Sequence, residues 1–247
     1  MLEVKKIIFV LVVLTTIVGV ASWKTDVFDK LLSSSGSKSQ PVFNKKHYSL
    51  DDPKSIWVIV NKTRQLETSS YVPGDLVQPE VSLRKGSGSS EMKLRKSAAS
   101  AIEKLFAAAE KSDFKLALAS GYRSYALQVQ TYNSEVKAFG QKIADKESAR
   151  PGYSEHQTGW AADIGPTSGK CVVLACFADT PEGKWLAANA HRFGFIIRYP
   201  KGLENIVGYA FEPWHLRYVG NDLAAEVNKS DQTLEEFFNL PFAPDYK

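Results

Sequence analysis

The chain has 247 residues, which is long enough for one large domain or two small ones with a sizeable buried core. Its hydrophobic content of 44% and charged content of 23% are ordinary values for a globular protein. The net charge of +4 is mild and no run of lysines and arginines is dense, so a nucleic-acid partner is not expected.

The first predicted element is an apolar run near the N-terminus. Lys5 and Lys6 precede this run, which extends from Ile7 to Ala21. A charged start followed by an apolar stretch of this length is typical of a signal peptide or of an N-terminal membrane anchor over residues 1–22, and both alternatives remain open. Either one predicts an extracytoplasmic protein, secreted or membrane-anchored. No cysteine follows the run, which argues against a lipoprotein.

A serine-rich tract follows, and residues 23–55 are expected to form a flexible tether. A coil of about 30 residues has a root-mean-square span on the order of 30 Å, enough to hold a domain clear of a membrane. The folded domain is expected over residues 56–228, beginning with "IWVIV" at 56–60, which is typical of a buried strand. Residues 229–247 are expected to be an extension that packs on this domain.

Helical and strand patterns alternate from there on. Residues 97–112 place Ala98, Ile102 and Leu105 on one face, which predicts an amphipathic helix. The alternation in "FKLALAS" at 114–120 predicts a strand. The remaining predicted elements are a helix over 124–146, a helix opened by Thr180 and Pro181 and closed by Gly194, and strands at 195–199 and within 208–219. Together they predict an α+β fold with a small, mainly antiparallel sheet flanked by helices.

The two cysteines, Cys171 and Cys176, lie close together in "CVVLAC". In an exported protein such a pair indicates a small loop-closing disulfide, with two buried thiols as the alternative. No histidine lies near them, so they do not form a zinc knuckle.

Two segments carry the candidate chemistry. "YSEHQTGWAAD" at 153–163 contains His156 and Asp163, and "FEPWHLRYVG" at 211–220 contains Glu212 and His215. If "GWAADIG" is a strand, its alternation sets Asp163 apart from the large apolar side chains. Gly159 permits a turn that returns His156 toward the same place. A bulge at the proline after Glu212 would aim Glu212 and His215 at one point.

A catalytic zinc takes three protein ligands and leaves a position for water, with a nearby carboxylate as proton acceptor. His156, Asp163 and His215 fit the ligands, and Glu212 fits the carboxylate. Histidines that are only hydrogen-bonded within the fold are an equal alternative on spacing alone.

Both segments, with "SGYRSYALQ" at 120–128 and "RYPKG" at 198–202, resemble the D-alanyl-D-alanine carboxypeptidases of the vancomycin-resistance type (VanY-like). They are also similar to the related L,D-carboxypeptidases that trim bacterial wall peptides. The resemblance covers residues 56–228 and implies the zinc D,D-peptidase-like fold. It implies Zn²⁺ as cofactor, with His156, Asp163 and His215 as ligands and Glu212 as general base.

The resemblance also implies roles in substrate binding. Arg123 would meet the scissile carbonyl and its developing oxyanion, while Gln128 and Ser154 would help to hold the terminal residue. The expected reaction is removal of the C-terminal D-alanine from peptidoglycan stem peptides by a monomeric enzyme. The alternatives are an L,D-carboxypeptidase or an endopeptidase on the same scaffold and, less favoured, a wall-binding module without catalysis.

Overall fold

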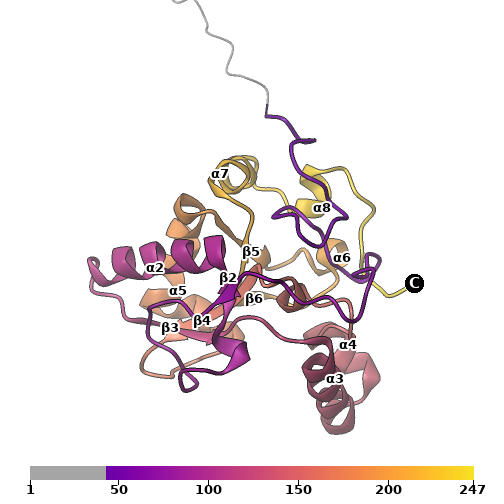
Figure 1. Cartoon of the computed structure of the whole chain (residues 1–247), viewed down its shortest axis with the longest axis horizontal. Helices are drawn as coiled ribbons and strands as arrows, with labels where there is room; N and C mark the ends of the chain where they lie inside the picture. The colour runs from indigo at the N-terminus through magenta and orange to yellow at the C-terminus, as the bar shows by residue number, and fades with distance from the viewer. Residues whose placement is uncertain (1–42) are drawn as a thin grey trace, which may run out of the picture. The chain divides into compact units, whose positions relative to one another are not determined.

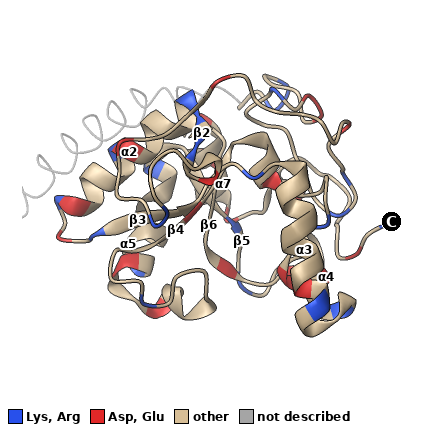
Figure 2. Cartoon of the chain, turned by 60° about the horizontal axis from the view of Figure 1, so that its bottom comes forward, with Lys and Arg blue, Asp and Glu red and all other residues tan. Residues whose placement is uncertain are grey.

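The computed structural model describes residues 43–247, so the segment over 1–22 and most of the predicted tether lie outside the described residues. Within the described part, no helix is both long and apolar enough to cross a bilayer. Residues Asn44–Lys247 form one compact unit. Figure 2 shows basic and acidic residues interspersed along this unit, as the mild net charge suggests.

A four-stranded sheet with every pair antiparallel lies at the centre of the unit, in the order β3-β4-β6-β5. A short antiparallel pair, β1 with β2, lies apart from it. The strands are β1 (Leu76–Val77), β2 (Leu94–Arg95), β3 (Leu116–Ser120), β4 (Ala161–Pro166), β5 (Phe195–Tyr199) and β6 (Glu212–Tyr218). The predicted α+β fold with a small antiparallel sheet is therefore confirmed.

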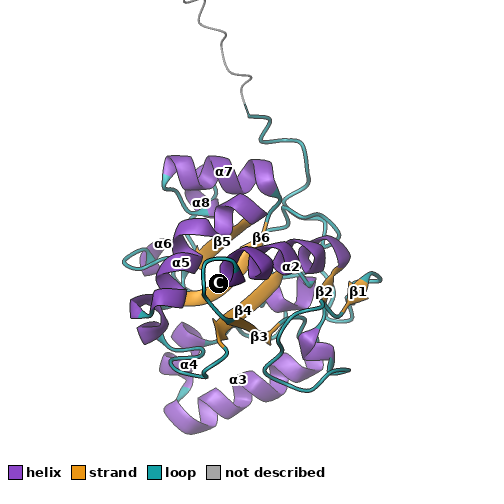
Figure 3. Ribbon diagram, turned by 90° about the vertical axis from the view of Figure 1, so that its left-hand side faces the viewer, coloured by secondary structure: helices purple, strands orange, loops and turns teal. Residues whose placement is uncertain are grey.

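Helices surround this sheet (Figures 1 and 3). They are α2 (Lys96–Glu110), α3 (Tyr125–Phe139), α4 (Gln141–Glu147), α5 (Pro181–Asn189), α6 (Glu204–Val207), α7 (Asn221–Ser230) and α8 (Leu234–Phe237). In both views α2 and α5 lie together over the strands, with α7 and α8 toward one end of the unit and the α3–α4 pair toward the other. Both faces of the sheet are therefore used, one for the core and one for the site.

The alternation of β4 assigns the two faces. Ala162 and Ile164 belong to the main hydrophobic core, together with Ile102 and Leu105 of α2, and all four are fully buried. Asp163, between them in sequence, points to the opposite face by the period-2 geometry of a strand. The predicted helix at 97–112 and the predicted strands at 114–120, 195–199 and 208–219 are confirmed.

The predicted strand at 56–60 is wrong. The segment is buried, but the carbonyl oxygens of Ile56 and Val58 accept hydrogen bonds from the Arg217 side chain, at 2.9 and 2.7 Å, instead of pairing with a strand. The amide of Ile59 donates to Leu50 O. A buried arginine therefore occupies acceptors that a sheet ladder would need. The compact unit also begins before this segment, at Asn44.

The predicted helix over 124–146 is interrupted. Gly140 has φ 81°, which ends α3 and begins α4 after it. Ser124 caps α3, since its side chain accepts a hydrogen bond from the amide of Leu127. The helix opened by Pro181 runs to Asn189, and a 3₁₀ turn then leads to Gly194 in the left-handed region. The predicted bond between Cys171 and Cys176 is present.

Candidate metal centre

Three candidate ligands meet above the face of the sheet opposite the core. Asp163 on β4 pairs in register with His215 on β6, so their side chains emerge side by side. His156 arrives from a 3₁₀ turn, Glu155–Thr158, which ends at Gly159 with φ 73°. His156 Nε2 lies 3.3 Å from Asp163 Oδ2, and His215 Nδ1 lies 3.2 Å from Asp163 Oδ1.

A bulge on β6 brings in the fourth residue. The register with β5 changes between Ile197, paired with Leu216, and Tyr199, paired with Glu212, so β6 contains extra residues around Pro213. Proline cannot donate to the ladder, which is why the irregularity is tolerated there. As a result Glu212 Oε2 lies 3.5 Å from His215 Nδ1.

The other ring nitrogen of each histidine has a fixed partner. His156 Nδ1 lies 2.6 Å from the carbonyl oxygen of Gly121, and His215 Nε2 lies 3.4 Å from Glu155 Oε2. Donation of these N–H groups leaves Nε2 of His156 and Nδ1 of His215, which both face Asp163, with lone pairs available to a metal ion. Such outer partners are usual for histidines that bind metals, because they fix the tautomer and the ring orientation.

The donor set fits a zinc ion. One ligand atom from each of His156, Asp163 and His215 lies within 4.8 Å of the other two, and all three residues are buried. Asp163 Oδ1 is buried without a hydrogen bond from any described residue, although it faces His215. Two imidazole nitrogens and a carboxylate oxygen that lacks a donor are the ligands expected of a three-ligand catalytic site.

A buried group of four charges supports His215 from behind. Glu155 Oε1 accepts hydrogen bonds from Arg198 Nε at 2.8 Å and from Arg217 Nη1 at 2.9 Å. Arg198 in turn donates to both oxygens of Glu235, at 2.9 and 2.6 Å. All four side chains are essentially inaccessible to solvent, and their charges cancel.

The pKa values reflect this packing. Burial would raise the pKa of Glu155, but Arg217 and Arg198 outweigh it and hold the value well below the usual range. Burial raises the pKa of Glu212 to about 8, opposed mainly by His215. Burial lowers the pKa of His215, but the carboxylates of Asp163 and Glu155 beside the ring outweigh it and raise the value to about 9. A proton on His215 and a metal cation therefore compete, since both neutralise the same carboxylates.

Two residues of the polar wall come from α3 and from the loop that joins β3 to it. Arg123 Nη1 donates to Gln128 Oε1 at 3.1 Å, and Arg123 Nη2 lies 3.9 Å from Asp163 Oδ2. Gln128 Nε2 is held by the carbonyl oxygen of Ala149 at 2.6 Å. Ser154 is buried and lines the same space. The guanidinium is thereby fixed beside the candidate ligands.

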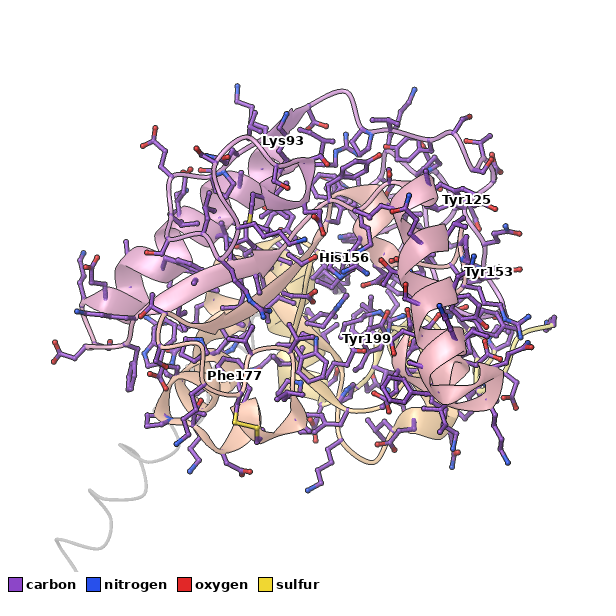
Figure 4. The ribbon with its side chains drawn as sticks, turned by 90° about the horizontal axis from the view of Figure 1, so that it is seen from below. Lys93, Tyr125, Tyr153, His156, Phe177 and Tyr199 are labelled. Carbon is purple, nitrogen blue, oxygen red and sulfur yellow. A yellow bond between two sulfur atoms is a disulfide. The ribbon has the colours of Figure 1, made fainter. Side chains whose placement is uncertain are left out.

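All seven residues singled out from the sequence line one cavity of about 170 Å³. Figure 4 shows two of the lining residues, His156 and Tyr199, near the middle of the unit. The sequence analysis missed several further lining residues: Glu155, Val173, Tyr199, Tyr209 and Trp214. Glu155 and Trp214 stand next to residues of the predicted site, and Tyr199 lies inside "RYPKG". Their positions in these motifs were the signal that could have identified them. Nothing in the spacing of Val173 indicated that its loop would reach the metal centre.

Comparison with known proteins agrees with this geometry. Residues 91–221 match the family profile described as VanY, D-alanyl-D-alanine carboxypeptidase. The chain is 43% identical over 189 residues to YodJ of Bacillus subtilis (strain 168), an alignment that covers 76% of this chain and 69% of that protein. It also matches enterococcal D-alanyl-D-alanine carboxypeptidases and spans 35% to 64% of their lengths.

Two solved structures are similar over most of the described unit. The LdcB LD-carboxypeptidase aligns with a TM-score of 0.72 at 44% identity, covering 76% of this chain and 87% of that one. A Zn(II) complex of the vancomycin-resistance D,D-pentapeptidase VanY aligns with a TM-score of 0.59 at 30% identity, covering 75% and 99%.

Proposed function

The chain belongs to the VanY family of D-alanyl-D-alanine carboxypeptidases and is a zinc metallocarboxypeptidase. On this premise we propose that it removes the C-terminal D-alanine from peptidoglycan stem peptides. The observation that carries the proposal is the position of Arg123. Its guanidinium lines the cavity that contains the three candidate ligands and Glu212, where it offers positive charge to a substrate carbonyl oxygen or carboxylate. An enzyme that acts on chain ends needs such a charge beside its metal.

In this proposal His156, Asp163 and His215 would hold the zinc ion, the three protein ligands typical of a catalytic site. When bound, zinc supplies Lewis acidity that lowers the pKa of a coordinated water to about 7. Glu212 Oε2 accepts a proton from the attacking water and then delivers it to the nitrogen of the departing D-alanine. Its place on the bulge of β6, next to His215, suits this transfer.

Arg123 and its neighbours bind the substrate. The Arg123 guanidinium donates to the carbonyl oxygen of the scissile bond, where negative charge grows during attack. Gln128 keeps the guanidinium in place through its side-chain oxygen. Gln128 and Ser154 also present polar groups to the terminal residue of the peptide. Because Gln128 is anchored to Ala149 O, the donors are arranged before substrate binds.

An L,D-carboxypeptidase activity is the second candidate. The aligned LdcB structure, described as an LD-carboxypeptidase, shares 44% identity with this chain, against 30% for the VanY complex. The two activities differ in one stereocentre beside the scissile bond. The metal ligands and Glu212 would serve either one, so the shape of the cavity decides between them.

The deciding experiment is incubation of the purified protein with pentapeptide and tetrapeptide stems, with and without a chelator, and identification of the products by mass. Loss of one D-alanine from the pentapeptide alone supports the D,D activity, and loss from the tetrapeptide supports the L,D activity. A chelator should stop either reaction. If both peptides stay intact in the presence of zinc, the proposed function is wrong.

A pentapeptide amidated at its C-terminus is the matched control. A carboxypeptidase must bind a free carboxylate, so the amidated pentapeptide should remain uncut. Cleavage of the amidated pentapeptide at the same rate as the pentapeptide with a free carboxylate would instead indicate an endopeptidase. A wall-binding module would bind these peptides and cut none of them. The presence of Glu212 beside the three candidate ligands argues against a wall-binding module, because a structural zinc site needs no additional carboxylate.

A substrate in the cell wall requires the domain to lie outside the membrane. The predicted signal or anchor segment over residues 1–22 would deliver it there, and the tether would let it reach the wall. We expect a monomer, because one copy of the chain supplies every residue that the mechanism uses.

A further inference from the structure

A loop beside the metal cavity is closed by a disulfide. Cys171 is bonded to Cys176, and Val173 between them lines the same cavity as Glu212 and His215. In Figure 4 the disulfide lies to one side of His156, next to Phe177, and Tyr125 at the start of α3 lies to the other. Val173 is 37% exposed, so part of its side chain is available for contact with a ligand.

The loop is fixed on both sides of Val173, to strand β4 before it and to the hydrophobic core after it. Val172 packs so closely on Gly165 of β4 that a Cβ on that glycine would lie 2.7 Å from a Val172 methyl carbon. Phe177, in the 3₁₀ helix Ala175–Asp179, is fully buried. Its carbonyl oxygen would lie 1.9 Å from a Cβ on Gly183 of α5. The loop therefore cannot leave the cavity without disturbing the core.

The backbone at Val173 is strained. Val173 has φ 56° and Cys171 has φ 57°, both in the left-handed region, which β-branched residues such as valine rarely adopt. Such conformations persist where the surrounding structure enforces them, and they are frequent at functional sites. A turn from Leu174 N to Cys171 O, at 3.3 Å, lies within the disulfide-closed loop. These constraints direct Val172 onto Gly165 of β4 and Val173 to the cavity.

We propose that Val173 is a specificity-determining residue that contacts the aliphatic part of the peptide on the N-terminal side of the scissile bond, and that the disulfide holds it there. This inference rests on the proposed carboxypeptidase function. Arg123, Gln128 and Ser154 are assigned to the terminal residue, and Val173 is the one branched aliphatic side chain among the described residues that line the cavity, so its methyl groups suit an apolar part of the remaining peptide.

A contact away from the reacting atoms strengthens substrate and transition-state binding equally. Removing it should therefore raise KM and leave kcat unchanged. The contact should matter for a full stem peptide and matter less for a short N-acetyl-D-alanyl-D-alanine substrate, which lacks the N-terminal part.

The test compares Val173→Ala with Leu174→Ala. Leu174 belongs to the same loop and is 57% exposed, but it does not line the cavity, so it is the matched control. Val173→Ala should raise KM for the stem pentapeptide roughly fivefold, with an unchanged kcat and an unchanged zinc content. Leu174→Ala should match the wild type. An unchanged KM in Val173→Ala, or an equal rise in both variants, overturns the proposal.

The role of the disulfide is tested with the double variant Cys171→Ala/Cys176→Ala, which avoids reductants that bind zinc. If the bond holds Val173 in place, KM for the pentapeptide should rise as it does in Val173→Ala. A wild-type KM in a folded double variant overturns this part.

Calorimetric titration of wild type and Val173→Ala with the tetrapeptide product separates this inference from the proposed function. Weaker binding to the variant supports the contact whether or not turnover occurs, and equal binding overturns it. Failure of the wild type to cut any peptide contradicts the proposed function instead.

Discussion

Glu155 lies between a candidate zinc ligand and two arginines, so one buried carboxylate serves two neighbours. Its Oε2 meets His215 Nε2, and its Oε1 accepts from Arg198 and Arg217. A buried ion pair contributes little net stability when it is intact, yet removal of one partner costs about 3–5 kcal/mol because a charge remains without compensation. Glu155 therefore connects the orientation of a metal-binding ring to the stability of the fold.

Glu155→Gln is predicted to weaken zinc binding by about 10- to 100-fold, as expected when the outer partner of a metal-binding histidine is changed. The free energy of unfolding should fall by about 3–5 kcal/mol in the same variant. Zinc competition with a chromogenic chelator and urea unfolding of the zinc-free protein measure the two effects. Glu110→Gln, at an exposed position on α2, should change neither. Zinc affinity equal to the wild type's would remove Glu155 from the metal site.

Glu212→Gln is predicted to retain zinc and lose turnover by roughly 10²- to 10⁴-fold, because the amide cannot accept the proton of water. Zinc content by elemental analysis and release of D-alanine from a pentapeptide give the two readings. A variant that hydrolyses the peptide at the wild-type rate would exclude Glu212 as the base. Loss of zinc together with activity would instead identify Glu212 as a ligand.

At the scale of elements, α3 and α4 form a pair that supports the polar wall of the cavity. Asp145 of α4 accepts hydrogen bonds from Arg150 Nε and Nη2, both at 2.9 Å, and from the Tyr132 hydroxyl of α3 at 2.7 Å. The bonds from Arg150 are the main reason that the pKa of Asp145 is lowered, with smaller help from Tyr132 and Lys62.

Asp145→Asn is predicted to lower the free energy of unfolding by about 1 kcal/mol at pH 7, an amount that allows for the partial exposure of the pair. A carboxyl whose pKa is lowered by folding stabilises the protein above its unfolded value near 3.9, and this contribution disappears as the pH falls through the folded value. The difference from wild type should therefore be constant above about pH 5 and shrink below about pH 4. Urea unfolding at several pH values checks this, and a difference that grows toward low pH would contradict it.

Local patterns predicted the elements whose own residues decide their structure. The alternation along 160–164 placed Asp163 on the face opposite Ala162, and the proline at 213 marked the bulge of β6. The start of the helix at Pro181 followed from the preference for proline at the first helical position. The family motifs then added roles for residues that spacing alone left undecided.

Features that depend on distant partners could not be predicted in this way. "IWVIV" has the composition of a strand, but its carbonyl groups are bound by Arg217, far along the chain. Glu155 was visible inside a motif, yet only the fold shows that it meets His215 and two arginines. A glycine at 140 within a helical pattern is often tolerated, so its positive φ was not foreseen.

At the scale of the whole molecule, segments from both ends of the described chain close the buried charge network. Glu235 of α8 binds Arg198 and also accepts from Asn61 Nδ2 at 2.9 Å. The last residues add a second attachment, because the hydroxyl of Tyr246 accepts from the amide of Arg150 at 2.8 Å. The metal centre is therefore supported by residues that lie outside the matched region 91–221.

Deletion of residues 233–247 is predicted to unfold the protein or to lower its free energy of unfolding by at least about 3–5 kcal/mol, since Arg198 loses a buried partner. Deletion of Lys247 alone is the control and should have no effect, as this residue is exposed. Glu235→Gln removes the charge but keeps the segment, and it should reproduce most of the decrease in the free energy of unfolding. Circular dichroism during urea unfolding provides the measurement. A truncated protein as stable as wild type would show that the network does not need α8.

The position of Glu235 also bears on when the enzyme matures. A ribosome makes this residue after the other three members of the charge network, and an N-terminal export signal would draw the chain through its channel in the same order. Until α8 emerges, Arg198 has only Glu155 to neutralise it and shares that carboxylate with Arg217, so the support behind His215 is incomplete. A nascent chain therefore completes the charge network behind its metal centre only after α8 has been delivered.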